Sequence, residues 1–476
     1  MLKKVQFLIL ATFLIISLIG CSEETTDNTK NEVVIKQYSS TPTFLKNLMP
    51  GIQAFTLLSS DDVLPQSAGF IFGGSADGSG LLKNSDGSFT FLVNHEDNFS
   101  ISRITLDKTF KPVKGEYVIN SDLGKYRLCS ATLATPSEHG FGPLFISCGE
   151  SSAKSEALGL NPYAAPLTQP KWLKALGHWS FENAVPLPKD AYPGKTVIII
   201  GDDDSSPGGG QVALYVSNTV GDLDNGSLYA MCRDDGDTSE TNMKTGQTFN
   251  VTFKKINDIS QEDLNPQCTA LGAIRFGRTE DLDYQKGGGA NGRNVFFTTT
   301  GQKNYPSRTV AGRVYKLVMD ANDPLKGKLE CILDGDDKAG PANLFQNPDN
   351  ICVTKNYVYV QEDPNTYGSE THDAYIYQYN IATKELKVVC EIDHYRGQSN
   401  PNNPGTLYDK ADSKKGSAEY GALIDISDLV GIPDVFLLSV QPHGWNGDKY
   451  KNPDKGSLRP TENQASLIVI LKGLPR

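Results

Sequence analysis

The chain has 476 residues, with 56 acidic and 45 basic side chains, and its formal net charge is −11 at pH 7. A protein with this excess of acidic residues does not have the basic surface that binds the phosphates of nucleic acid. We therefore expect no nucleic-acid partner. Seven of the eight cysteines follow Cys21, an odd number that cannot pair completely in disulfides within one chain.

The first predicted element is an export signal. Lys3-Lys4 is a basic start, residues 5–19 are apolar, and Leu18-Ile19-Gly20-Cys21 resembles a lipoprotein cleavage box. The apolar run is shorter than the roughly 20 residues that a membrane span needs. We therefore interpret residues 1–20 as a bacterial lipoprotein signal peptide, with lipidation (such as palmitate) of Cys21.

This signal sets the expected domain organisation and location. Residues 21–41 are rich in Glu, Thr and Asn and predict a flexible tether, and residues 42–476 predict one continuous domain. The protein is expected to be a monomer at the cell envelope, on the periplasmic or cell-surface side. Only its N-terminal lipid would enter the membrane.

Six apolar runs of strand composition then end abruptly in residues that bind metal or phosphate. The runs are residues 89–93, 144–147, 197–201, 295–297, 358–360 and 436–440. Three of the polar ends, at Asn94, Cys148 and Asp202, are equally spaced along the chain. Strands that all finish in polar groups make sense if they converge on one centre. The pattern predicts an all-β fold, a β-propeller of about six blades around a central metal-binding channel.

Other elements are less regular. Residues 43–49 and 169–176 have the composition of short helices, and residues 398–415 are rich in Asn, Pro, Gly and Lys. We expect the last segment to be a long surface loop.

Two groups of residues suggest metal chemistry. Cys148 and Glu150 are two residues apart and face the same side of an extended strand, and a thiolate with nearby carboxylates suits iron. The alternative is that Cys148 is a small buried side chain or half of a disulfide. Glu182 lies in an apolar context, where a carboxylate must be paired or metal-bound to stay charged.

A third group combines opposite charges. Arg278 and Glu280 point to the same side of an extended backbone, so Arg278 can hold a phosphate while Glu280 binds a metal. The alternative is an ordinary salt bridge between the two. No G-x-S-x-G or H-E-x-x-H motif occurs in the sequence, which disfavours serine hydrolases and zinc metalloproteases.

The order of these motifs carries a family resemblance. They are Asn94-His95-Glu96, Cys129, residues 145–150, residues 181–184, Gly201-Asp202-Asp203, residues 226–229, residues 277–281, Pro348-Asp349-Asn350 and Gln441-Pro442-His443. In this order they resemble the PhoX-type alkaline phosphatase family, from about Phe70 to Trp445.

The resemblance implies a metal-dependent phosphatase. It implies a six-bladed propeller that holds ferric iron and calcium in its channel and hydrolyses phosphate monoesters, with a metal-bound oxygen in place of a protein nucleophile. By this likeness Arg278 holds the substrate phosphate and Cys148 is the thiolate ligand of iron. The implied carboxylate ligands are Glu182 and Glu280, with Glu96, Glu150, Asp202 and Asp349 as further metal groups.

Two features depart from the family pattern. Gly149 stands where the family usually has a second glutamate, which removes one possible ligand, and Lys3-Lys4 replaces the usual twin-arginine signal. The metal would then be acquired after export. Two alternatives stay open: a calcium-dependent propeller hydrolase of the phytase or lactonase kind, and a non-catalytic propeller that binds a ligand at the cell surface.

Overall fold

A computed structural model describes residues 32–364, 370–393 and 415–476. The predicted signal peptide, Cys21 and most of the predicted 398–415 loop lie outside the described residues. Val33 to Arg476 form one compact unit. Residues 33–41, predicted as tether, belong to this unit: Thr41 is buried, and its Oγ1 lies 2.7 Å from Oγ of Ser59.

The unit is built from antiparallel meanders that follow one another along the chain. The first two are β3 (Ala76–Lys83), β4 (Phe89–His95), β5 (Ser100–Leu106) and β6 (Pro112–Ile119), then β7 (Leu128–Ala134), β8 (Leu144–Gly149), β9 (Ala157–Leu160) and β10 (Lys171–Trp172). The third is β11 (Phe181–Pro186), β12 (Thr196–Asp202), β13 (Val212–Ser217), β14 (Ser227–Arg233) and β15 (Thr248–Lys255). The fourth is β16 (Thr279–Tyr284), β17 (Asn294–Thr299), β18 (Arg313–Met319) and β19 (Lys326–Asp334).

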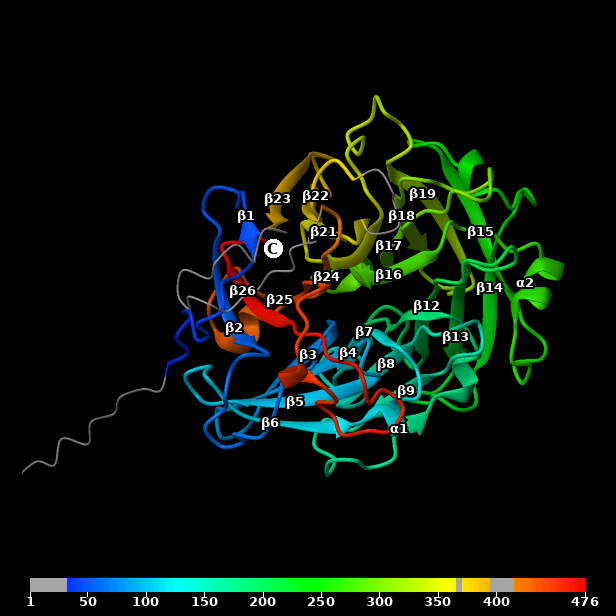
Figure 1. The fold of residues 1–476 in the computed structure, drawn as a ribbon. Helices are drawn as coiled ribbons and strands as arrows, with labels where there is room; N and C mark the ends of the chain where they lie inside the picture. The colour runs from blue at the N-terminus through cyan, green and yellow to red at the C-terminus, as the bar shows by residue number, and fades with distance from the viewer. Residues whose placement is uncertain (1–31, 365–369, 394–414) are drawn as a thin grey trace, which may run out of the picture. The chain divides into compact units, whose positions relative to one another are not determined.

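The last two meanders each recruit a strand from the start of the unit. The fifth is β20 (Pro348–Val353), β21 (Tyr357–Glu362), β22 (Tyr375–Asn380) and β23 (Leu386–Ile392), with β1 (Leu45–Lys46) at its edge. The sixth is β24 (Glu419–Asp425), β25 (Val435–Gln441) and β26 (Leu467–Lys472), with β2 (Gln53–Ser59) at its edge. In Figure 1, β2 in blue therefore lies beside β26 in red.

These meanders are the blades of a propeller. Their first strands contact one another in the order β3, β7, β11, β16, β20 and β24, and β24 returns to β3, which closes a ring (Figure 1). The fold is an all-β propeller, as the sequence predicts. The six apolar runs of the sequence are the second strands of the blades: β4, β8, β12, β17, β21 and β25.

The six blades form five hydrogen-bonded sheets. Strand β15 pairs with β19, with Thr248 opposite Glu330, so the third and fourth blades share one nine-stranded sheet. β15 and β19 are the outermost strands of these two blades. By pairing with each other they satisfy the backbone N–H and C=O groups that an exposed strand edge would leave unpaired.

Every first strand carries a β-bulge at an equivalent place. In β3, Ala76 pairs with His95 but Ser79 pairs with Val93, so three steps along β3 match two along β4. Corresponding shifts occur in β7, β11, β16, β20 and β24. Side chains of a regular strand point alternately to its two faces. A bulge interrupts this alternation, so in each first strand it changes the direction of one side chain.

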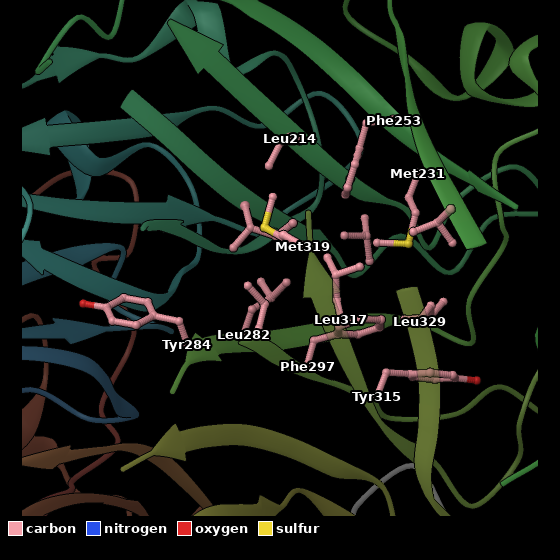
Figure 2. Packing of buried hydrophobic residues seen from close by; sticks show 14 of the residues in the cluster. Leu214, Met231, Phe253, Leu282, Tyr284, Phe297, Tyr315, Leu317, Met319 and Leu329 are labelled. Carbon is pink, nitrogen blue, oxygen red and sulfur yellow. The ribbon is translucent and has the colours of Figure 1, made fainter. Parts of the chain in front are cut away.

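The hydrophobic core fills the space between neighbouring blades. Figure 2 shows the cluster between the third and fourth blades, where Leu214, Met231 and Phe253 lie across from Leu317 and Phe297. Faces of strands rich in Val, Ile, Leu and Phe supply these clusters, which explains the strong apolar runs of the second strands.

Two helix predictions are wrong. Within residues 43–49 the chain forms strand β1, because Leu45 pairs with Ile392 of β23. Residues 169–176 form β10 and a 3₁₀ turn (Lys174–Leu176). The α-helices of the described residues are α1 (Ser121–Gly124), α2 (Asn265–Leu271) and α3 (Ser427–Val430), and the other 3₁₀ turns are η2 (Glu240–Asn242), η3 (Gly289–Arg293) and η5 (Asp448–Tyr450).

Two further findings concern the described residues as a set. All seven of their cysteines are buried and unpaired. None of their helices has the length and apolar character that a bilayer crossing requires.

The sixth blade should be sensitive to loss of packing at its edge. Ile470 of β26 is fully buried and pairs with Phe55 of β2 and Leu437 of β25. Ile470→Ala should lower the free energy of unfolding by about 2–5 kcal/mol. Val63 is 72% exposed, so Val63→Ala should change it by less than about 0.5 kcal/mol. Urea unfolding measures both, and equal effects would show that packing of the Ile470 side chain does not stabilise the sixth blade.

Candidate metal centre

A polar cavity of about 190 Å³ lies where the first strands of the blades converge. The first bulge residue of five blades lines it, and each is a residue that can bind a metal: Asp77, Cys129, Glu182, Glu280 and Asp349. The bulges thus point five equivalent side chains at one place.

The sixth blade departs from this repeat. Its bulge residue is Gly421, where a Cβ atom would lie 2.6 Å from the Cα of Asp77, so no side chain fits. Glu419, at the start of the same strand, lines the cavity in its place. The close approach of β24 to β3 therefore requires glycine at position 421. The ligand candidate of the sixth blade is Glu419, two residues earlier in the strand.

The ends of second strands supply a further layer of carboxylates. Glu96, Glu150, Asp203 and Asp363 come directly after β4, β8, β12 and β21, and all four line the cavity. The prediction that polar strand ends converge is confirmed for these blades.

Three sets of side chains have their ligand atoms close enough to share a cation. In each set the atoms lie within 4.8 Å of one another: Asp77, Glu96 and Cys129; Glu182, Glu280 and Asp349; Asp349, Asp363 and Glu419. The first set joins a soft thiol to two carboxylates, and the other two offer only carboxylate oxygen. Asp349 belongs to two sets, so cations held by those sets would share it.

The negative charge of this cavity is far larger than its positive charge. Ten carboxylates line it: Asp77, Glu96, Asp97, Glu150, Glu182, Asp203, Glu280, Asp349, Asp363 and Glu419. Among the described residues, two arginines and one histidine line it as well: Arg127, Arg278 and His443. Buried carboxylates without cations must take up protons or repel one another.

The electrostatics agree with that imbalance. Burial, and then the charge of neighbouring carboxylates, raises the pKa of Asp77, Glu182 and Glu280 well above their ordinary values. Burial also raises the pKa of the Cys129 thiol. Asp77 Oδ1 and Asp203 Oδ1 are buried without a hydrogen-bond partner. Unsatisfied oxygens, clustered carboxylates and one thiol fit multivalent cations, which would keep all these groups deprotonated.

Two arginines reach the cavity from different blades. Arg278 Nη2 lies 2.7 Å from Asp203 Oδ2 and 3.3 Å from Glu280 Oε1, and its side chain is 22% exposed. Arg127 Nη1 lies 2.9 Å from Glu96 Oε1. Both guanidinium groups are thus oriented by carboxylates of the cavity and can meet an anion that enters it.

The backbone that presents Arg278 is held from behind by Glu240, a buried residue of η2. Glu240 Oε2 accepts hydrogen bonds from the backbone N–H of Gly277 (2.8 Å) and of Thr309 (2.9 Å). Glu240 Oε1 accepts from Thr299 Oγ1 (2.8 Å) and from the Tyr315 hydroxyl (3.2 Å). These bonds fix a strained turn, because Arg278 has φ of 65°, a left-handed conformation that costs free energy in a non-glycine residue.

A polar layer supports the ligand candidates from the other side. Ser130 Oγ donates to Glu182 Oε1 (2.7 Å), and Asn183 Nδ2 donates to Asp281 Oδ1 (2.6 Å). Asn350 Nδ2 lies 3.3 Å from Ser130 Oγ. Ser130, Asn183, Asp281 and Asn350 are the second bulge residues of their strands, so the repeat that aims the ligand candidates also places this polar layer beside them.

Most residues predicted from the sequence meet here. Arg278, Glu96, Glu150, Glu182, Glu280 and Asp349 all line the cavity.

Cys148 and Asp202 do not line the cavity. Cys148 is fully buried in β8 and packs in a hydrophobic cluster with Ile146 and Trp179. Asp202 accepts hydrogen bonds from the backbone N–H of Ser180 (3.1 Å) and of Gln211 (3.2 Å). Their roles as metal ligands stay predictions.

The sequence interpretation missed five residues as ligand candidates: Asp77, Cys129, Asp203, Asp363 and Glu419. A signal for the first two was present. In five first strands the second residue is acidic or cysteine and is followed by a small or polar residue, as in Asp77-Gly78, Cys129-Ser130 and Glu182-Asn183.

Comparisons with known proteins agree with this arrangement. The model of the family described as alkaline phosphatase PhoX matches residues 158–403. The structure of Pseudomonas fluorescens PhoX in complex with vanadate, a transition state analogue, is similar with a TM-score of 0.64 at 13% identity, over 93% of this chain and 97% of that chain. No curated protein matches the sequence significantly.

Two sugar-cleaving enzymes also have similar structures. An α-L-arabinanase of Penicillium chrysogenum complexed with arabinobiose has a TM-score of 0.39 at 10% identity, over 89% of this chain and 98% of that one. The GH93 α-L-arabinofuranosidase of Fusarium graminearum has a TM-score of 0.37 at 11% identity, over 87% and 97%.

Removal of multivalent cations should make stability fall as the pH rises. Folding raises the pKa of the cavity carboxyls above the ordinary values of 3.8 and 4.5, so the folded protein keeps protons that the unfolded chain loses. Urea unfolding in EDTA should therefore give a lower free energy at about pH 8 than at about pH 5.5. Added calcium should remove most of that difference. A higher free energy at the upper pH in EDTA would contradict this account.

Proposed function

The chain belongs to the alkaline phosphatase PhoX family, and we propose that its phosphatase activity depends on metal ions held in the central cavity. The protein is a phosphoric monoester hydrolase of the alkaline phosphatase type. The observation that carries the metal dependence is the convergence of ten carboxylates and the Cys129 thiol on one cavity of about 190 Å³.

The three sets of ligand candidates differ in the cation they suit. Asp77, Glu96 and Cys129 combine hard and soft donors, which favours iron. The two sets that share Asp349 offer only oxygen, which favours calcium. We therefore propose iron at the set that contains Cys129 and calcium at the carboxylate sets.

The bound cations would supply Lewis-acid stabilisation of the charge that builds up on the phosphoryl group. Arg278 is proposed to bind a phosphoryl oxygen, because its guanidinium is charged, partly exposed and oriented by Asp203 and Glu280. Arg127 enters from another blade and adds a second cationic group at the cavity. The structure of Pseudomonas fluorescens PhoX in complex with vanadate, a transition state analogue, supports phosphoryl binding by this fold, and we assign that role here to the cavity that Arg278 lines.

We also propose that the enzyme is anchored at the cell envelope through a lipid on Cys21. The basic start, the apolar run and the residues 18–21 support this proposal. Replacement of Cys21 by serine should release the protein from the membrane fraction, and labelled palmitate incorporation measures the modification. Unchanged membrane association and labelling would reject it.

Cys129 and Cys148 provide a matched test of the iron site. Both are buried cysteines, but only Cys129 lines the cavity. Cys129→Ala should lose bound iron and at least about 100-fold in kcat/KM for p-nitrophenyl phosphate. Cys148→Ala should keep its iron and its activity while losing some stability. Elemental analysis with turnover assays decides between them, and loss of iron only in Cys148→Ala would restore the sequence prediction.

Glu240 should act through Arg278. Glu240→Leu removes the acceptor for Gly277 N–H and should raise the KM for p-nitrophenyl phosphate roughly tenfold, since Arg278 is displaced. Glu240→Gln should keep KM near the wild-type value, because its amide oxygen accepts both N–H groups and its amide nitrogen donates to Thr299 and Tyr315. Ile470→Ala, in the sixth blade and without contact to Glu240, is the control for lost stability alone. A similar KM rise in Ile470→Ala would show that the rise in Glu240→Leu reports lost stability and not the positioning of Arg278.

A further inference from the structure

A second cavity opens directly beside the metal cavity. It measures about 710 Å³, and Glu150, Asp203 and Arg278 line both cavities. A phosphate monoester whose phosphoryl group meets Arg278 therefore has space for its alcohol part in this second cavity, which we call the leaving-group pocket. Its volume falls in the range of about 300–1,000 Å³ that is typical of small-molecule sites.

Polar side chains are the majority of those that line the leaving-group pocket. Besides the shared residues, hydroxyl, amide and charged side chains line it, including Ser151, Ser205, Gln302, Lys303, Asn304 and Asn347. No aromatic side chain lines it among the described residues, and Ala153 and Val310 are its apolar side chains. Small-molecule sites are usually lined by apolar and aromatic groups, so this composition is informative.

The walls of the pocket are fixed by hydrogen bonds from behind. Arg308, which is 2% exposed, donates from Nη2 to the backbone oxygens of Gly209 (2.9 Å) and of Ser206 (3.0 Å), and from Nη1 to Gln302 Oε1. Gln302 Nε2 in turn donates to the Ser205 backbone oxygen. Two loops of different blades are thus tied together, and the polar wall that they form is preorganised.

From this lining we propose that the leaving-group pocket selects phosphate monoesters of hydroxyl-rich alcohols, such as sugars and polyols, over aryl and long alkyl esters. The inference rests on the proposed function, because it assigns the alcohol part of the same substrate. An apolar leaving group would displace water from serine, amide and charged groups without replacing their hydrogen bonds, and each unpaired group costs free energy. A polyol replaces those hydrogen bonds with its hydroxyls.

Two non-hydrolysable phosphonates test this selectivity without the influence of leaving-group reactivity. 3,4-Dihydroxybutylphosphonate and hexylphosphonate have chains with equal numbers of heavy atoms and differ in hydroxyl content. Calorimetry on the metal-loaded full chain should show the dihydroxy compound binding at least about tenfold more tightly. Equal affinities, or tighter binding of hexylphosphonate, would overturn the proposal.

A variant localises the effect to the pocket. Asn304→Leu replaces a polar group of the wall by a hydrocarbon and should reduce the affinity ratio at least about threefold. Asn343 is exposed and does not line the pocket, so Asn343→Leu should leave the ratio unchanged. An unchanged ratio in Asn304→Leu would reject the assignment of selectivity to this wall.

The outcomes separate this inference from the proposed function. If metal-loaded enzyme hydrolyses p-nitrophenyl phosphate but binds both phosphonates equally, only the selectivity is rejected. If no ester is hydrolysed in the presence of iron and calcium but the dihydroxy compound binds more tightly, the metal-dependent activity is rejected and the polar pocket stands.

Discussion

Repulsion among carboxylates is the constraint on which the rest of this structure depends. Ten of them converge where the first strands meet, and among the described residues that line the cavity Arg127 and Arg278 are the basic side chains that carry a permanent positive charge. The fold holds these charges together: the bulges of four blades aim Asp77, Glu182, Glu280 and Asp349 at the cavity, and a fifth aims Cys129. Ser130 donates a hydrogen bond that orients Glu182. A cation bound in this cavity would be attracted by several carboxylates at once, and this attraction would offset their mutual repulsion.

The same constraint explains what the sequence does and does not reveal. The second strands are buried between blades, so their runs of Val, Ile, Leu and Phe are easily recognised, and the propeller could be predicted from them. The first strands are as long as the second strands but carry more polar residues, and their bulges break the alternation of side chains, so Asp77 and Cys129 escaped notice as ligand candidates. Cys148 and Glu150 were expected on one face of an extended strand. However, β8 ends at Gly149, between them, and their side chains diverge.

A salt bridge between Arg278 and Glu280 is compatible with binding of a phosphate by Arg278. The ordinary salt bridge is present at 3.3 Å, and it lies inside the cavity where an anion can reach the guanidinium. The expected extended backbone is absent at Arg278, whose φ is positive. What a single sequence cannot display is the support from Glu240, which lies far away along the chain and acts through the backbone N–H groups of Gly277 and Thr309.

The pairing of β2 with β26 has a consequence for the lifetime of the fold. This seam joins segments that are far apart in sequence, and its closure is a non-local step that carries a large loop entropy. The cavity draws residues from every blade, so it is complete only while the seam is closed. Ions that bind the closed ring and not the opened one would lower the population of the opened ring by mass action. Under the proposed metal dependence, a low supply of metal would lower the activity and would also raise the population of the opened ring, which proteases can cleave.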